Sequence, residues 1–151
     1  MLRRGILRGG ALIGLLYCGA AARVAAAAES ALGFNELYAK QSVLGMEFSM
    51  RVKTLAGHTV RILGYLAPPL KSDVRFFVLT RAPVALCPFC NSDADWPSDI
   101  VVVYPRAPLD AATDGLPVAV TGTLELGSKI DPQTGFVSLV RVIDAEFTVV
   151  R

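Results

Sequence analysis

The 151-residue sequence contains little of what catalysis usually requires, with one histidine, one tryptophan and three cysteines. Because His58 is the sole imidazole, general acid–base chemistry at neutral pH has few candidate residues. The sequence shows no Ser/His/Asp set, no pair of catalytic carboxylates and no glycine-rich phosphate loop. It also shows no internal repeat and leaves no room for the helical crossovers of a parallel sheet. These absences argue against the common hydrolases, nucleotide-binding enzymes and doubly wound α/β folds.

The sequence also lacks the excess of positive charge that nucleic-acid binding requires. The chain carries 15 basic and 13 acidic residues, but four of the arginines fall within residues 1–28, where no acidic residue occurs. The remaining chain holds 11 basic and 13 acidic residues, which gives a net charge of −2. We therefore expect no nucleic-acid partner.

Residues 1–28 are predicted to be a signal peptide. Arg3, Arg4 and Arg8 form a basic start, an uncharged apolar run follows, and a run of alanines supplies small residues for cleavage. The apolar run is shorter than the ~20 residues that cross a bilayer, and Arg23 interrupts it. We expect an exported, periplasmic protein whose mature chain has no stable membrane span.

The leader also suggests how the protein is exported. Its paired arginines, Arg3 and Arg4, resemble a twin-arginine signal, and the alternative is a Sec signal. Cys18 also lies inside the leader. A lipoprotein signal has a small residue directly before its lipidated cysteine, whereas here that residue is Tyr17. We expect Cys18 to be removed with the leader rather than lipidated.

Residues 29–54 are predicted to form a helical lead-in, and residues 55–151 a single β domain. The remaining chain of about 120 residues is long enough for one hydrophobic core. At helical spacing, one apolar face of the lead-in is formed by Leu37, Tyr38, Leu44, Phe48 and Val52.

Beyond the lead-in the hydrophobic period changes to two, or to short apolar runs, which predicts strands. The predicted strands span residues 59–66, 74–80, 100–104, 116–126 and 138–150. Gly64 and Gly122 are candidates for a bend or bulge, and a change of parity near residues 143–145 indicates another. The expected fold class is all-β with a short N-terminal helical segment and a closed antiparallel, five-stranded OB-like barrel. A small open β-sandwich is the alternative.

The segment Gly-Tyr-Leu-Ala-Pro-Pro-Leu-Lys, residues 64–71, resembles the opening of an uncharacterised family of exported bacterial OB-like proteins. In that family this opening is followed by an aromatic strand, a cysteine-bearing loop, a β-branched strand and a V-x-G-x-L strand. The corresponding residues here are 76–79, 87–90, 100–104 and 120–124. The resemblance covers roughly residues 55–150 and includes Asp95-Trp96-Pro97 after the cysteines. It implies export, an OB-like fold and an accessory role beside a membrane transport system, and it brings no established activity.

Cys87 and Cys90, in the loop Leu86-Cys87-Pro88-Phe89-Cys90-Asn91, are the only cysteines after the leader. Outside the cytoplasm such a pair is usually oxidised, which predicts a disulfide between them. The second interpretation is a metal bound by the thiols. Two thiolates alone suit Cu(I), whereas a zinc site needs more ligands, of which His58 is a candidate. Further zinc ligands would come from the aspartates at 93, 95 and 99. Members of the resembled family carry Cys-x-His in this loop rather than Cys-x-x-Cys, so a metal role does not carry over directly from the resemblance.

A third interpretation of the pair is thiol–disulfide exchange. Cys87-Pro88-Phe89-Cys90 is close to the dithiol of glutaredoxins, in which a helix N-terminus lowers the pKa of the first thiol. Here the residues that follow the pair, up to Pro97, make a poor helix. The sequence leaves the three interpretations open.

Taken together, these features predict a non-enzymatic periplasmic accessory or binding protein with an OB-like fold and the cysteine loop as its functional face. The expected partner is an envelope protein such as a membrane transporter component, and the expected cargo is thiol-bound zinc or copper. The alternative is a small thiol–disulfide oxidoreductase or redox sensor that uses Cys87 and Cys90. We expect Trp96 and Pro97 to pack the loop onto the mouth of the barrel.

Overall fold

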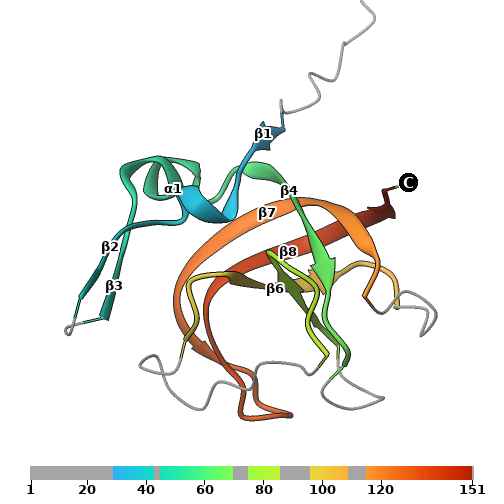
Figure 1. The fold of residues 1–151 in the computed structure, drawn as a ribbon. Coiled ribbons are helices and arrows are strands. Elements are labelled where there is room, and N and C mark those ends of the chain that lie inside the picture. Colours follow the sequence, from blue (N-terminus) through green and yellow to red (C-terminus); the bar gives the residue numbers. More distant parts are fainter. Residues whose placement is uncertain (1–28, 43–44, 70–74, 86–95, 109–114, 151) are drawn as a thin grey trace, which may run out of the picture.

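The computed structural model describes residues 29–42, 45–69, 75–85, 96–108 and 115–150, and the chain is mostly β (Figure 1). Along the chain the elements are β1 (Ser30–Ala31), η1 (a 3-10 turn, Phe34–Glu36), β2 (Tyr38–Ser42), β3 (Gly45–Phe48), α1 (Met50–Leu55), β4 (Thr59–Leu66), β5 (Phe77–Thr80), β6 (Ile100–Pro105), β7 (Pro117–Ile130) and β8 (Val137–Val149). No helix in the described part of the chain is long and apolar enough to cross a membrane.

Five strands pair in a closed ring, in the order β4, β5, β6, β8, β7 and back to β4. The long β7 curves around one side of this ring, and the short β1 adds to β4 in parallel (Figure 1). All pairs within the ring are antiparallel except β6 and β8, which run parallel. The prediction of a wholly antiparallel arrangement is wrong at this pair. In a closed ring of five strands the direction cannot alternate at every pair, because five is an odd number, so one pair must run parallel. That pair is β6 and β8, which meet where the ring closes.

All five strand predictions within the ring are confirmed in position, but β5 begins at Phe77 rather than residue 74, and β7 is longer than predicted. β4 covers the predicted residues 59–66, and the strands predicted from 74, 100 and 138 lie at β5, β6 and β8. β7 continues to Ile130, past the predicted end at residue 126, because it stays paired with β8 beyond Gly127 through a register shift. The turn between β7 and β8 is therefore limited to the residues around Asp131.

The bulge predicted from the parity change near residues 143–145 is confirmed, and it lies opposite Gly122. Thr121 pairs with Glu146 and Thr123 pairs with Ile143, so one residue of β7 faces two of β8. A Cβ atom at Gly122 would lie 2.7 Å from the carbonyl oxygen of Ile143. Only glycine allows the two strands to approach this closely.

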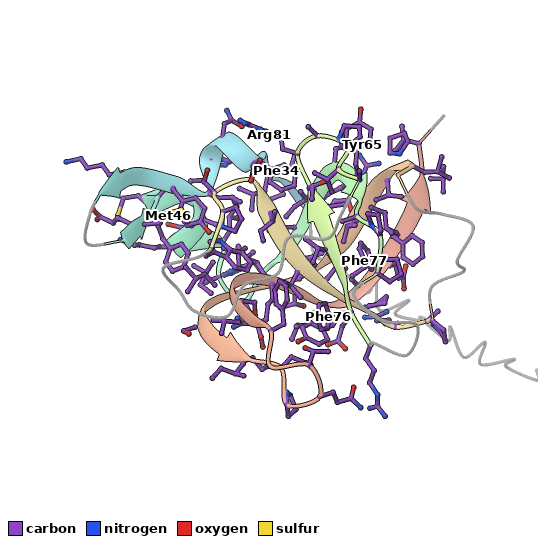
Figure 2. All side chains as sticks on the ribbon, turned by 60° about the horizontal axis from the view of Figure 1, so that its bottom comes forward. Phe34, Met46, Tyr65, Phe76, Phe77 and Arg81 are labelled. Carbon is purple, nitrogen blue, oxygen red and sulfur yellow. The ribbon has the colours of Figure 1, made fainter. Side chains whose placement is uncertain are left out.

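The core of the ring is filled by β-branched and aromatic side chains. At one end Phe76 packs against Phe136 and Tyr104, with ring centroids 5.4 and 5.6 Å apart. Figure 2 labels Phe76 and Phe77, which are 1% and 2% exposed. Val149 is 42% exposed, because it lies at the end of β8, beyond the packed region. Fully buried members of the core include Val60, Ile62, Leu79, Val101, Val103, Val118, Val120, Leu124, Val140 and Val142.

The helical lead-in predicted over residues 29–54 is wrong for most of its length. The segment contains β1, η1 and a hairpin of β2 and β3, and only α1 is helical. Tyr38 and Phe48 stack across the hairpin with ring centroids 5.6 Å apart, while Leu37 and Val52 are buried in the core. These apolar positions satisfy a hairpin as well as a helix, and the positive φ of Gly45 suits the chain reversal.

Several predicted features lie outside the described residues. They are the leader at residues 1–28, Leu44 of the predicted helical face, and the cysteine pair, Cys87 and Cys90. The signal peptide, the disulfide and the metal or redox roles of the pair therefore stay predictions.

Candidate functional site

The segment that contains the two cysteines leaves the ring after β5 and returns to it at β6. Thr80 at the end of β5 pairs with Ile100 at the start of β6. One residue further out, the backbone N–H of Arg81 donates to the carbonyl oxygen of Asp99 at 3.0 Å. Both ends of this segment, which we call the cysteine loop (residues 82–98), are therefore held side by side on the ring.

Thr80 directs the chain as it leaves β5. Its side chain is 2% exposed, and its hydroxyl oxygen lies 2.7 Å from the carbonyl oxygen of Ala82 and 3.2 Å from that of Tyr65. A buried hydroxyl without such acceptors would destabilise the fold, so these contacts favour one path for the chain. That path carries Arg81 to the surface beside Asp99.

The other end of the cysteine loop is anchored by Trp96. Its side chain is 3% exposed, and its indole N–H donates to the phenol oxygen of Tyr38 at 2.6 Å. Burial raises the pKa of Tyr38 to about 12, and the hydrogen bond from Trp96 opposes this rise in part. The phenol is therefore neutral at physiological pH. The sequence indicated that Trp96 packs against the ring, but nothing in it identified Tyr38 as the partner.

The hairpin of β2 and β3 is held in place by Ser49. The backbone N–H of Ser49 donates to the carbonyl oxygen of Leu37 at 3.0 Å, and its hydroxyl donates to the carbonyl oxygen of Glu36. The same hydroxyl accepts from the N–H of Val52 at 3.1 Å and so caps α1. Arg51 then pairs with Glu36 at 2.8 Å. These contacts join the hairpin, η1 and α1 into one unit beside the ring.

A hollow of about 220 Å³ lies where the hairpin, η1 and the base of the cysteine loop meet. Figure 2 shows Arg81 and Phe34 close together and Met46 on the hairpin, away from Phe76 and Phe77. The hollow combines apolar and polar walls, as small-ligand sites do. The residues that line it are Phe34, Asn35, Tyr38, Ala39, Lys40, Met46, Arg81 and Ser98.

A second hollow, of about 320 Å³, lies beside Tyr104, Asp131 and Asp144. Asp131 is 9% exposed, and its Oδ1 accepts from the N–H of Gln133, the N–H of Thr134 and the Thr134 hydroxyl at 2.9–3.1 Å. Burial and the charge of Asp131 raise the pKa of Tyr104 to about 12. The carboxylate is thus used to build the turn between β7 and β8, and we assign this hollow a structural role.

The predicted metal ligand His58 lies exposed in the turn between α1 and β4. Its Nδ1 is 3.2 Å from the carbonyl oxygen of Ala56. In the described ranges no three His, Cys, Asp or Glu side chains lie close enough together to hold a metal ion. Because Cys87 and Cys90 fall outside those ranges, a zinc or copper site that uses them with His58 stays a prediction.

Comparison with known proteins supports the fold. No family model matches the chain, and neither does any curated protein. Among solved structures the chain is similar to a DUF3299 family protein from Pseudomonas aeruginosa PAO1, with a TM-score of 0.57 and 16% sequence identity over 82% of this chain and 97% of that one. At this identity the likeness shows the fold alone. The segment at residues 64–71 and the cysteine loop, on which the resemblance to an uncharacterised family depends, stay untested by it.

Proposed function

We propose that this protein is a non-enzymatic binding module of the periplasm, and that the hollow at the base of the cysteine loop is its ligand site. The observation that carries the proposal is the junction of three segments at one place. The hairpin, η1 and the two ends of the cysteine loop all contribute to the hollow, and the Arg81–Asp99 and Trp96–Tyr38 hydrogen bonds fix their geometry. A preformed site of this kind loses little entropy on binding.

The scaffold of this module, on our proposal, is an OB-like barrel. The closed ring, in which the strands pair in the order β4, β5, β6, β8 and β7, supports this proposal, because OB-folds are five-stranded Greek-key barrels. OB-folds bind their ligands on loops and on one face of the sheet. The hollow lies beside the β5–β6 connection of this ring. The β2–β3 hairpin, which is added to the ring, supplies further walls of the hollow next to the β5–β6 connection.

Binding is favoured over catalysis by the side chains of the hollow. Its polar members are an arginine, a lysine, an asparagine, a serine and a tyrosine. His58 is not among the described residues that line the hollow, and no described residue there can act as a general base for Ser98. A serine without a base is a weak nucleophile, whereas all five groups are good hydrogen-bond donors.

The compartment and the partner of the module follow from the leader and the cysteines. An exported chain with a Cys-x-x-Cys loop suits the oxidising periplasm. There we propose an accessory role for an envelope partner, in the first place a membrane transporter component. Cys87 and Cys90 are either bridged or hold zinc or copper. Metal analysis of protein purified from the periplasm, in oxidised and reduced form, tests the metal part directly.

A fragment screen by NMR tests the ligand site. The exported, processed protein is labelled with ¹⁵N and titrated with small acids, amines and neutral aromatics. We expect some of these fragments to shift the backbone amides of Ala39, Met46 and Ser98. Ala39→Phe, which fills the hollow, should abolish these shifts, while Ala107→Phe, an exposed position after β6, should preserve them. If no fragment of any charge shifts these amides, the proposed site is wrong.

A further inference from the structure

We infer that the hollow binds a carboxylate joined to a small apolar group, and that Arg81 recognises its charge. This inference rests on the proposed function and specifies the ligand of the same site. It depends on the donors that face the hollow, on the charges around them and on the apolar side chains beside them.

Arg81 is an exposed cation at the rim of the hollow. Within the described part of the chain it forms no ion pair, although acidic residues lie on the elements around it. Asp99 lies beside Arg81 through their backbone hydrogen bond, but no ion pair between the two side chains is found. Glu36 of η1 pairs with Arg51 at 2.8 Å, and Glu47 of the hairpin lies 3.6 Å from Lys53. The guanidinium therefore remains available, and its planar fork matches a carboxylate.

Tyr38 supplies a second donor from the wall of the hollow. Its phenol oxygen accepts the indole N–H of Trp96, and no described residue accepts the phenol's own hydrogen. The half-buried phenol stays neutral, since burial raises its pKa to about 12, and so it keeps that hydrogen for a ligand. Asn35 and Ser98 add an amide and a hydroxyl at the same site.

The second cation of the hollow, Lys40, contributes less. It stands directly opposite Glu47 in the register of β2 and β3. Cross-strand partners of opposite charge attract each other, but Glu47 also lies 3.6 Å from Lys53, so it offsets only part of the field of Lys40. Arg81, which forms no ion pair with any described residue, is therefore the main cation for a negatively charged group of the ligand.

The apolar part of the ligand would contact Phe34, Tyr38 and Met46. Phe34 is 7% exposed, and the other two are partly buried against the core. A thioether next to aromatic rings adapts to ligands of different shape. At about 220 Å³ the hollow is smaller than a typical drug-sized site, which limits the apolar group to about one ring or a short chain.

Titration with two probes of the same shape tests the inference. The processed ¹⁵N-labelled protein is titrated at low salt with 3-phenylpropionate and with its neutral amide, 3-phenylpropionamide. We expect the acid to shift the amides of Ala39, Met46 and Ser98 and to bind about tenfold more tightly than the amide. Raising the salt concentration should reduce this preference, because the site is open to solvent.

Two variants complete the experiment. Arg81→Gln should abolish the preference for the acid while weak binding of the neutral amide persists, and Arg75→Gln, an exposed arginine outside the hollow, should leave the preference unchanged. Equal binding of acid and amide to the unaltered protein would overturn the inference but leave the proposed ligand site standing. An acid preference that survives Arg81→Gln would also overturn it. The peptide acetyl-Gly-Gly-Phe, with a free carboxyl end, then shows whether chain ends or free acids bind more tightly.

Discussion

The indole N–H of Trp96 donates a 2.6 Å hydrogen bond to the phenol oxygen of Tyr38, a residue 58 positions earlier in the chain. This bond joins the end of the cysteine loop to the N-terminal hairpin, two segments that are far apart in the sequence. It also places the only tryptophan of the protein in the core, at the edge of the proposed ligand site. Several properties of the protein should therefore depend on this pair.

Removing either partner of the Trp96–Tyr38 bond should destabilise the protein. Tyr38→Phe leaves the buried indole N–H without an acceptor, and Trp96→Phe removes the donor and opens a cavity, so we expect each to cost about 1–3 kcal/mol. The double variant should cost less than the sum, by roughly 1 kcal/mol. Urea unfolding followed by circular dichroism measures these differences. Tyr65→Phe, for which no side-chain hydrogen bond is found among the described residues, is the control; equal losses in all three single variants would contradict a special role for the pair.

Gly122 is predicted to tolerate no side chain. A Cβ atom there would lie 2.7 Å from the carbonyl oxygen of Ile143 and 2.7 Å from Val142 Cγ1, so β7 and β8 would have to separate at the bulge. We expect Gly122→Ala to lower the free energy of unfolding by about 1–3 kcal/mol. Thr123→Ala, one position further along β7, should cost less than about 1 kcal/mol. A neutral Gly122→Ala variant would show that the bulge relaxes freely.

The buried Arg141 is expected to matter far more than the exposed Lys129, although both pair with Glu125. Arg141 is 4% exposed; its Nη1 donates to the carbonyl oxygens of Gly127 and Ser138 at 2.8 and 2.9 Å, and its Nε lies 3.2 Å from Glu125. Arg141→Met should cost about 2–4 kcal/mol, because these buried acceptors lose their donor.

Lys129→Met is the matched control for this pair. Its side chain is 55% exposed and lies 3.6 Å from Glu125. Surface pairs contribute little, so the variant should change stability by less than about 1 kcal/mol. Thermal unfolding of the two variants side by side measures the contrast, and similar melting temperatures would refute it.

Alkaline pH should destabilise the protein through Tyr38 and Tyr104. The pKa of each phenol rises from 10.0 to about 12 in the folded state, chiefly through burial. Between these values the unfolded chain has lost a proton that the folded chain retains, so raising the pH favours unfolding. The stabilisation is complete below pH 10 and disappears as the pH approaches 12. Part of the tyrosinate absorbance should appear only as the pH approaches 12, and Tyr38→Phe and Tyr104→Phe should each remove part of this late signal. Titration of every phenol near pH 10 would contradict this.

The cysteine pair should be dispensable for folding. Cys87→Ser with Cys90→Ser should keep the native circular dichroism and lose about 2 kcal/mol at most, because a bridge across so short a loop restricts the unfolded chain little. The reduction potential of the unaltered protein then separates the roles of the pair. A bridge that resists reduction supports a structural disulfide, whereas an oxidising potential with a depressed thiol pKa supports thiol exchange. Loss of the native fold in the double variant would refute the expectation of independence.

The sequence predicted the five strands of the ring well because their hydrophobic period is local. Strand β4 alternates buried and exposed residues, and the β-branched run of β6 ends at a proline. The pattern failed over residues 29–54, where the apolar side chains of Tyr38 and Phe48 fit a hairpin as well as a helix. A short segment without strong propensity adopts whichever form its tertiary contacts favour.

The candidate site was predicted only in part, through the expectation that the cysteine loop is the functional face. Arg81 had no distinguishing signal in the sequence, since an exposed arginine after a strand is common. Its importance comes from its surroundings: Asp99, 18 residues away in the chain, is brought beside it by a backbone hydrogen bond, and Tyr38, 43 residues away, lines the same hollow. Long-range pairing of this kind leaves no local pattern.

By itself the sequence determined the positions of the strands, the glycine at the bulge and the expectation of export, because each depends on the order of residues within a short stretch. The tertiary structure alone decided that β8 lies parallel to β6, that β1, η1 and the β2–β3 hairpin form where a helix was predicted, and that Arg81, Tyr38 and Ser98 share one hollow. These outcomes depend on closing the ring, and closure is favourable only when all five strands bury their apolar faces together.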